Sequence, residues 1–79
     1  MVPDALILDR RVTPISVRLW MALDRYAGQD GAPMPAMSQI AMEIGCSPAV
    51  ASRAFAELIS VGWITGRPGD YNLEDEVAP

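Results

Sequence analysis

The stretch "SQIAMEIGCSPAVASRAFAELISVGWI", residues 38–64, decides how this chain folds. It reads as a short helix, a turn centred on Gly45, a longer helix and the start of a strand. Gly45 suits the left-handed backbone that ends a helix. Ser47 followed by Pro48 marks a helix start, because serine can cap free amides and proline fits the first helical position. The longer helix is therefore predicted from Pro48 to about Ser60.

The two helices of this stretch carry the residues that a tight crossing requires. Ala41 supplies a small side chain on the first helix where the second would pack against it. Apolar residues that would share a core recur at helical spacing on both helices. They are Ile40, Ile44, Cys46, Ala51, Ala54, Phe55 and Leu58. The pattern predicts a helix-turn-helix, two helices joined by a short turn that contains glycine.

A third helix is predicted ahead of this pair. Thr13-Pro14 repeats the cap-and-proline signal, and apolar residues follow at helical spacing in "ISVRLWMALDRYA". We place this helix at residues 14–27, with Gly28 as its stop. Residues 28–37 form a loop because their glycines and prolines exclude a regular element, although "PMP" can supply one short edge strand.

Two short strands are predicted after the helix pair. Gly62 ends the longer helix, and "WIT" (63–65) and "YNL" (71–73) are rich in residues that favour strands. The segment "GRPGD" (66–70) between them has the composition of a turn. The predicted fold class is therefore α+β, with three helices and a two-stranded β-hairpin.

The length of 79 residues leaves room for one small domain with one core. We place this domain at residues 13–73. Residues 1–12 precede it as an N-terminal arm that is either a strand or an extended segment. Residues 74–79 form an acidic tail that we expect to be solvated rather than packed.

Targeting and redox signals are few. No apolar run approaches the roughly 20 residues of a membrane-spanning helix, and the N-terminus lacks the features of a signal peptide. The single cysteine, Cys46, excludes an intrachain disulfide and a cysteine-based metal cluster. A reduced, cytoplasmic setting is the expectation.

The net charge of −4 is unevenly distributed. Residues 1–69 hold all six arginines and six acidic residues, so this part is neutral. The excess comes from Asp70 and from the acidic residues of the tail. Because phosphate attraction usually requires a basic domain, this balance argues against strong non-specific binding to DNA.

The chain resembles a winged helix-turn-helix domain of the bacterial type, as found in short helix-turn-helix proteins of actinobacterial plasmids, phages and regulators. The matching stretches are "TPISVRLWMALDRYAG", "IAMEIGCSPAVASRAFAELISVGWIT" and "GRPGDY". The resemblance implies that the second helix of the pair enters the major groove of DNA. It also implies that the hairpin, the wing, touches the backbone or minor groove, and that the protein acts as a dimer.

Positions that would face DNA are carried over from this resemblance. On the second helix and its cap they are Ser47, Ala49, Val50, Ser52 and Arg53. Arg67 would lie at the tip of the wing, and Gln39 would contribute from the preceding helix.

Four positions depart from the family pattern. Ala36 replaces the usual Ser or Thr cap, Val50 replaces a hydroxyl residue, and Ala56 and Ile59 replace basic or polar residues. These changes remove hydrogen-bond donors, so one domain would bind DNA weakly. We therefore expect a homodimer, formed through the helix at 14–27 and the N-terminal arm, whose apolar residues exceed what one core needs.

The two arginines each have a second interpretation. Arg53 is either a base or phosphate contact or the partner of Glu57 four residues later. Arg67 either reaches the minor groove or is neutralised by Asp70 nearby.

The uncharged positions are equally open. Ser47 is first a helix cap and second a phosphate site, and Ser52 is either a groove contact or a plain surface hydroxyl. Ala49 and Val50 can meet thymine methyl groups. They can equally join Ala56 and Ile59 in an apolar surface that binds protein.

Catalysis has no support in the sequence. The chain has no His, no nucleophile paired with a base, no glycine-rich phosphate loop and no metal-ligand spacing. We expect no enzyme activity, no cofactor and no metal. The preferred function is sequence-specific binding of double-stranded DNA by a homodimeric transcriptional regulator or mobile-element accessory factor. The alternative is a protein-interaction module that does not bind DNA directly and uses the apolar face or the acidic tail to bind a partner.

Overall fold

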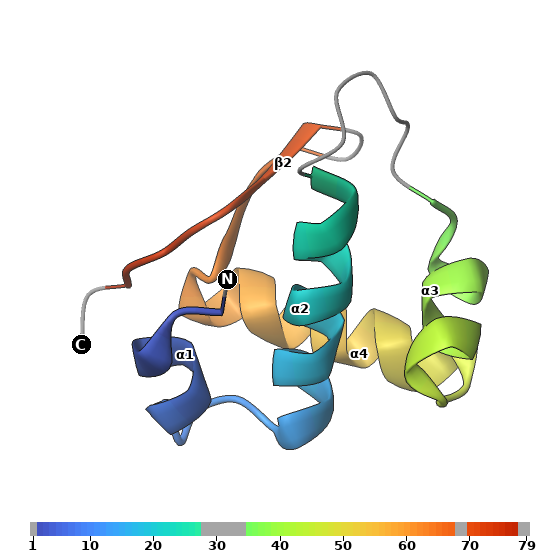
Figure 1. Ribbon diagram of the computed structural model, residues 1–79, viewed down its shortest axis with the longest axis horizontal. Helices are drawn as coiled ribbons and strands as arrows, with labels where there is room; N and C mark the ends of the chain where they lie inside the picture. Colours follow the sequence, from blue (N-terminus) through green and yellow to red (C-terminus); the bar gives the residue numbers. More distant parts are fainter. Residues whose placement is uncertain (1, 28–34, 68–69, 78–79) are drawn as a thin grey trace.

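A computed structural model of the chain describes residues 2–27, 35–67 and 70–77. Within these residues the fold is α+β, with four helices and a two-stranded antiparallel hairpin (Figure 1). The elements are α1 (Asp4–Leu8), α2 (Pro14–Ala27), α3 (Met37–Ile44), α4 (Pro48–Val61), β1 (Ile64–Arg67) and β2 (Asp70–Leu73).

The ends of α3 and α4 and the starts of α2 and α4 confirm the predictions made from glycine and cap-and-proline signals. Gly28, the predicted stop of α2, lies outside the described residues. Two glycines close α3 and α4 in the left-handed region, Gly45 with φ of 81° and Gly62 with φ of 108°. At the start of α4, the Ser47 hydroxyl accepts the Val50 amide at 3.2 Å. Since α4 continues to Val61, it is one residue longer than predicted.

The prediction of a strand or extended arm before residue 13 was wrong, and so was the count of three helices. Asp4–Leu8 forms α1, a helix too short to be stable alone. Leu6 anchors it, because its side chain is fully buried in the core while its neighbours face solvent. A short apolar run such as "ALIL" fits a helix turn or a strand equally well, so packing decided its form.

The hairpin follows α4 directly, with Ile64 opposite Leu73 and Thr65 opposite Asn72. Trp63 was predicted to begin β1, but its amide instead bonds the Leu58 carbonyl at 2.9 Å and completes the end of α4. Part of the suggested "PMP" edge strand, Pro33 and Met34, lies outside the described residues.

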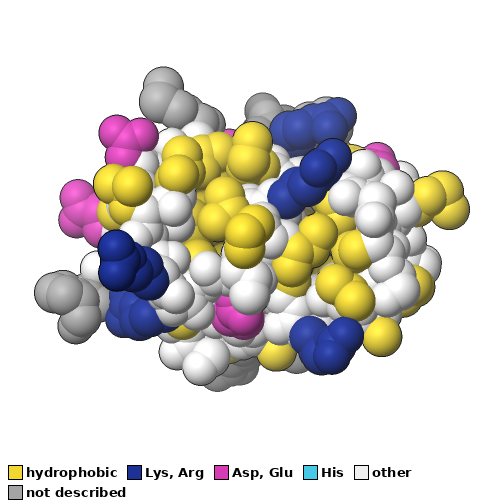
Figure 2. Space-filling view, turned by 90° about the horizontal axis from the view of Figure 1, so that it is seen from below, with side chains coloured by type: hydrophobic (Ala, Val, Ile, Leu, Met, Phe, Trp, Pro, Cys, Tyr) yellow, Lys and Arg dark blue, Asp and Glu magenta, His cyan; other side chains and the backbone are white. Residues whose placement is uncertain are grey.

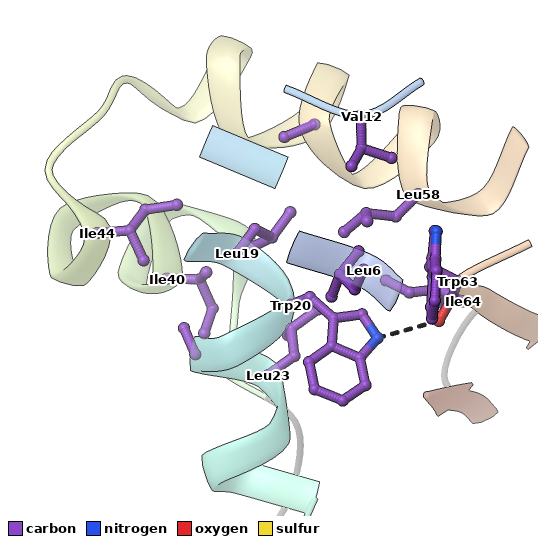
Figure 3. Close-up of a cluster of buried hydrophobic side chains, with 12 residues drawn as sticks. Leu6, Val12, Leu19, Trp20, Leu23, Ile40, Ile44, Leu58, Trp63 and Ile64 are labelled. Carbon is purple, nitrogen blue, oxygen red and sulfur yellow. Dashed lines mark hydrogen bonds between the residues drawn. The ribbon is translucent and has the colours of Figure 1, made fainter. Parts of the chain in front are cut away.

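The core fills the space between α2, α3 and α4 and extends under α1 and β1 (Figure 3). Two tryptophans dominate it, Trp20 and Trp63, each 1% exposed. The Trp20 indole donates to the Trp63 carbonyl at 3.1 Å, which Figure 3 shows as a dashed line. Figure 3 also shows Leu6 beside Leu58 and Trp63, so α1 is part of the same core.

The expectation that the acidic tail is solvated was wrong for Glu74 and Val77. The Glu74 amide bonds the Trp63 carbonyl at 3.0 Å, and the Glu74 carboxylate accepts the Thr65 hydroxyl at 2.9 Å. Val77 packs against the core beside Gly62. Val77 is the apolar residue of this otherwise acidic segment, and its contact with the core holds the segment against the domain. Asp75 and Glu76 remain exposed.

No helix among the described residues has the length and apolar character needed to cross a bilayer.

Asp9 connects the end of α1 to the core. Its carboxylate accepts the Trp63 indole N–H at 2.9 Å and the Arg11 guanidinium Nε and Nη2 at 2.9 and 2.8 Å. The Arg11 amide donates a further hydrogen bond to it. The hydrogen bonds from Arg11 and Trp63 hold the pKa of Asp9 well below its usual value of 3.8.

We expect Asp9→Asn to lower the free energy of unfolding at pH 7, because the charged carboxylate is the form that these donors stabilise. Since the folded-state pKa lies below the unfolded one, this contribution is complete above about pH 4 and declines as pH falls further. Urea unfolding of both proteins between pH 7 and pH 2.5 should show their difference shrinking at acid pH. The exposed Asp75→Asn is the control, and a difference that is independent of pH would contradict the assignment.

Candidate nucleic-acid interface

One side of α4 is open to solvent along its whole length. The exposed residues on the helix recur at intervals of three and four, which places them on a single face. We call this surface the α4 face; it consists of Ala49, Ser52, Arg53, Ala56, Ile59 and Ser60. The opposite side buries Ala51, Ala54 and Leu58 against the core. The same helix therefore supplies both packing and a free surface.

The structure brings three of the predicted DNA-facing residues together on the α4 face: Ala49, Ser52 and Arg53. Val50 is half-buried, so it lies at the margin of this face rather than within it. Gln39 is exposed on α3, the helix that packs against α4. Arg67 belongs to β1, but the placement of its side chain lies outside what the structure describes.

Ser47 caps α4, as one of its two interpretations required. Its hydroxyl oxygen accepts the Val50 amide, which leaves its own hydrogen free to donate outward. Pro48 has no amide hydrogen, and the Ala51 amide bonds the Ser47 carbonyl at 3.0 Å. Within the described part of the chain, the Ala49 amide bonds no acceptor. The start of α4 thus presents one hydroxyl and one amide donor to solvent.

Arg53 does not pair with Glu57, although the two are one helical turn apart. The Glu57 carboxylate is turned toward the start of α2, where it accepts the Thr13 amide at 2.5 Å and the Ser16 hydroxyl at 3.0 Å. Ser16 is fully buried, so this acceptor satisfies a polar group inside the protein. As a result, Arg53 is exposed and forms no ion pair with any described residue.

A shallow groove of about 250 Å³ separates the α4 face from the start of α2. Val50 and Arg53 line it from α4, and Thr13 and Ile15 line it from the α2 side. Ala54 and Glu57 of α4 also line it. The sequence analysis treated Thr13 only as a helix cap and Ile15 only as a helix residue, because no local pattern shows which residues of α4 they approach.

Positive charge is dispersed over this side of the molecule. Figure 2 shows arginine side chains in several groups with hydrophobic and uncharged atoms between the groups, and no single basic patch covers this view. Arg11 is already paired with Asp9 at 2.8 Å. Arg18 and Arg25 lie on α2 beside Glu43, in a different groove. Arg53 is therefore the single arginine of α4 and the main charge of its exposed face.

Among the described residues, no three His, Cys, Asp or Glu side chains gather closely enough to hold a metal ion. Cys46 is half-buried and packs against the core, as a small apolar residue does.

Comparisons of this chain with protein-family models, with characterised proteins and with solved structures find no match.

We expect Glu57→Ala to lower the free energy of unfolding by about 1–2 kcal/mol, because Ser16 loses its charged acceptor and the Thr13 amide loses its cap. Glu57→Gln keeps an oxygen acceptor and should cost less. Urea denaturation measures both, and amide exchange should show faster opening of the first turn of α2. Ser60→Ala, exposed on the same helix, is the matched control. Equal stability of Glu57→Ala and wild type would exclude this role.

Proposed function

We propose that this chain is a winged helix-turn-helix protein that binds double-stranded DNA at specific sequences as a homodimer. In this proposal α3 and α4 are the helix pair, and the β1–β2 hairpin is the wing. The left-handed Gly45 between the two helices supports it, as does the hairpin directly after α4. The observation that carries it is Arg53, exposed and unpaired within the described residues, on a face otherwise made of small and apolar side chains.

The α4 face suits insertion into the major groove. A helix of 14 residues is about 21 Å long, which spans several base pairs. Ala49, Ser52 and Ala56 are short, so the helix backbone can approach the base edges closely. Arg53 would then donate two hydrogen bonds to a guanine or a phosphate, and Ala49 would contact a thymine methyl group.

The start of α4 and the flanking elements would hold the protein in register on the duplex. The Ala49 amide and the Ser47 hydroxyl are donors at a helix N-terminus, where a phosphate is favoured. Gln39 on α3 would add a neutral backbone contact. Arg67 at the end of β1 would reach the flanking phosphates or the minor groove.

Two copies are required because one copy offers few charged contacts. Each phosphate contact adds an increment to the electrostatic part of the binding free energy. The α4 face of one copy supplies one arginine for such contacts. A dimer doubles the contacts and reads two half-sites. Such a protein would act by occupying its site in the bacterial cytoplasm, as a transcriptional regulator or as an accessory factor of a plasmid or phage.

A second candidate function is a protein-interaction module that does not bind DNA. It is favoured by Ile59, which is 44% exposed at the far end of the α4 face. An exposed isoleucine beside Ala56 contributes apolar area to a protein interface and no hydrogen bond to a phosphate.

The two candidates separate on one experiment. Purified chain is mixed with a random duplex library at low salt, and the retained DNA is sequenced. The DNA proposal predicts an enriched motif with two-fold symmetry, and binding that weakens as salt rises. No retained DNA even at low salt would overturn it and leave the protein-interaction module.

Arg53→Ala should weaken binding to the enriched motif by at least about tenfold, because each lost bidentate contact costs about 1–3 kcal/mol. Fluorescence anisotropy with labelled duplex measures this loss, and circular dichroism checks that the exposed substitution preserves the fold. Arg18→Ala on α2 is the matched control and should retain binding. Unchanged affinity of the Arg53 variant would remove α4 from the interface.

A further inference from the structure

The short helix α1 exposes two large apolar side chains. Ile7 is 57% exposed and Leu8 is 77% exposed, whereas Leu6 between Ala5 and Ile7 is fully buried. Leu6 alone is enough to anchor α1 to the core. Most of the surface of this pair therefore lies outside the packing of the described fold, and an exposed apolar patch is one mark of an interaction surface.

Opposite charges flank this apolar pair along the chain. Asp4 lies in the first turn of α1 and is exposed, and Arg10 is exposed just after the helix ends. Neither forms an ion pair with another described residue, whereas the neighbouring Arg11 is held by Asp9. Asp4 precedes Ile7 by three residues, and Arg10, just beyond the end of α1, follows it by three. Along the chain, opposite charges therefore lie at equal spacing on either side of Ile7.

We propose that α1 is a homodimer interface, in which the α1 helices of two copies pack antiparallel with the two-fold axis at Ile7. In this arrangement the exposed Ile7 and Leu8 of each copy cover those of the other. Asp4 of each copy faces Arg10 of the second copy, so two ion pairs close the edges. A two-fold interface requires a surface of this kind, because each residue must meet its partner in both directions.

This inference rests on the proposed DNA-binding homodimer and names its interface. In Figure 1, α1 lies toward one end of the molecule. The residues of the α4 face belong to a different helix. The α4 face takes no part in the interface and stays free.

The end of the molecule that holds α1 also holds the C-terminal segment (Figure 1). Figure 2 shows hydrophobic side chains beside both acidic and basic ones at this end. A membrane surface or an acidic partner would favour a surface of one charge sign, whereas a second copy of the same chain matches a mixed one.

The first test measures the mass of the chain in solution without DNA. Sedimentation equilibrium should show a dimer, and Leu8→Ser should weaken it by about 100-fold, because the interface loses two leucine side chains, each worth at least tenfold. Met42→Ser is the matched control: Met42 is 82% exposed on α3, and its loss should leave the dimer unchanged. A monomeric wild type, or a Leu8 variant that dimerises as wild type does, would overturn the proposal.

The second test addresses the register. Asp4→Arg and Arg10→Asp each place like charges opposite one another, so each variant alone should dimerise about fivefold more weakly. An equimolar mixture of the two pairs opposite charges again and should form a heterodimer close to wild-type strength. Heterodimers no stronger than the single variants would overturn the antiparallel register. Both dimerisation tests are made without DNA. The effect of Arg53→Ala on DNA binding therefore does not change their results, and failure of one proposal can be distinguished from failure of the other.

Discussion

Trp63 is the residue on which the remaining structure depends. Its carbonyl accepts the Trp20 indole at 3.1 Å and the Glu74 amide at 3.0 Å, and its indole donates to Asp9 at 2.9 Å. Its own amide closes the end of α4. One buried residue thus joins α2, the C-terminal segment, the end of α1 and the junction between α4 and β1. A chain of 79 residues has a small core, so a single buried residue that contacts several elements holds a large share of the fold together.

The contacts of Glu57 explain why Arg53 on the α4 face forms no ion pair with a described residue. Glu57 is the natural partner of Arg53 on an isolated helix, yet it is bound to Thr13 and Ser16 at the start of α2. This contact joins α2 to α4 and satisfies a buried hydroxyl, which is worth more than a solvent-exposed ion pair between helix neighbours. Arg53 is exposed as a consequence. The residue that carries the proposed function is therefore available because a nearby carboxylate serves the fold.

Charge sets the limit on what one copy of this protein can do. The part of the chain before the acidic segment is neutral, and its arginines are dispersed rather than joined in one patch (Figure 2). Strong binding to a polyanion such as DNA would then require two or more copies of the protein, each making the same few contacts. The exposed apolar pair on α1 lies outside the α4 face, so the proposed dimerisation and the proposed DNA binding would use different surfaces.

The sequence by itself determined the start of α4 through Ser47 with Pro48, and the ends of α3 and α4 through Gly45 and Gly62. Helical periodicity also predicted that Ala49, Ser52 and Arg53 are exposed on α4, but not that Val50 is half-buried. Only the tertiary structure decided that "ALIL" is helical, that Glu57 leaves Arg53 unpaired and that Val77 packs. Each of these outcomes depends on contacts between residues far apart in the chain, such as Asp9 with Trp63, and local patterns carry no information about such pairs.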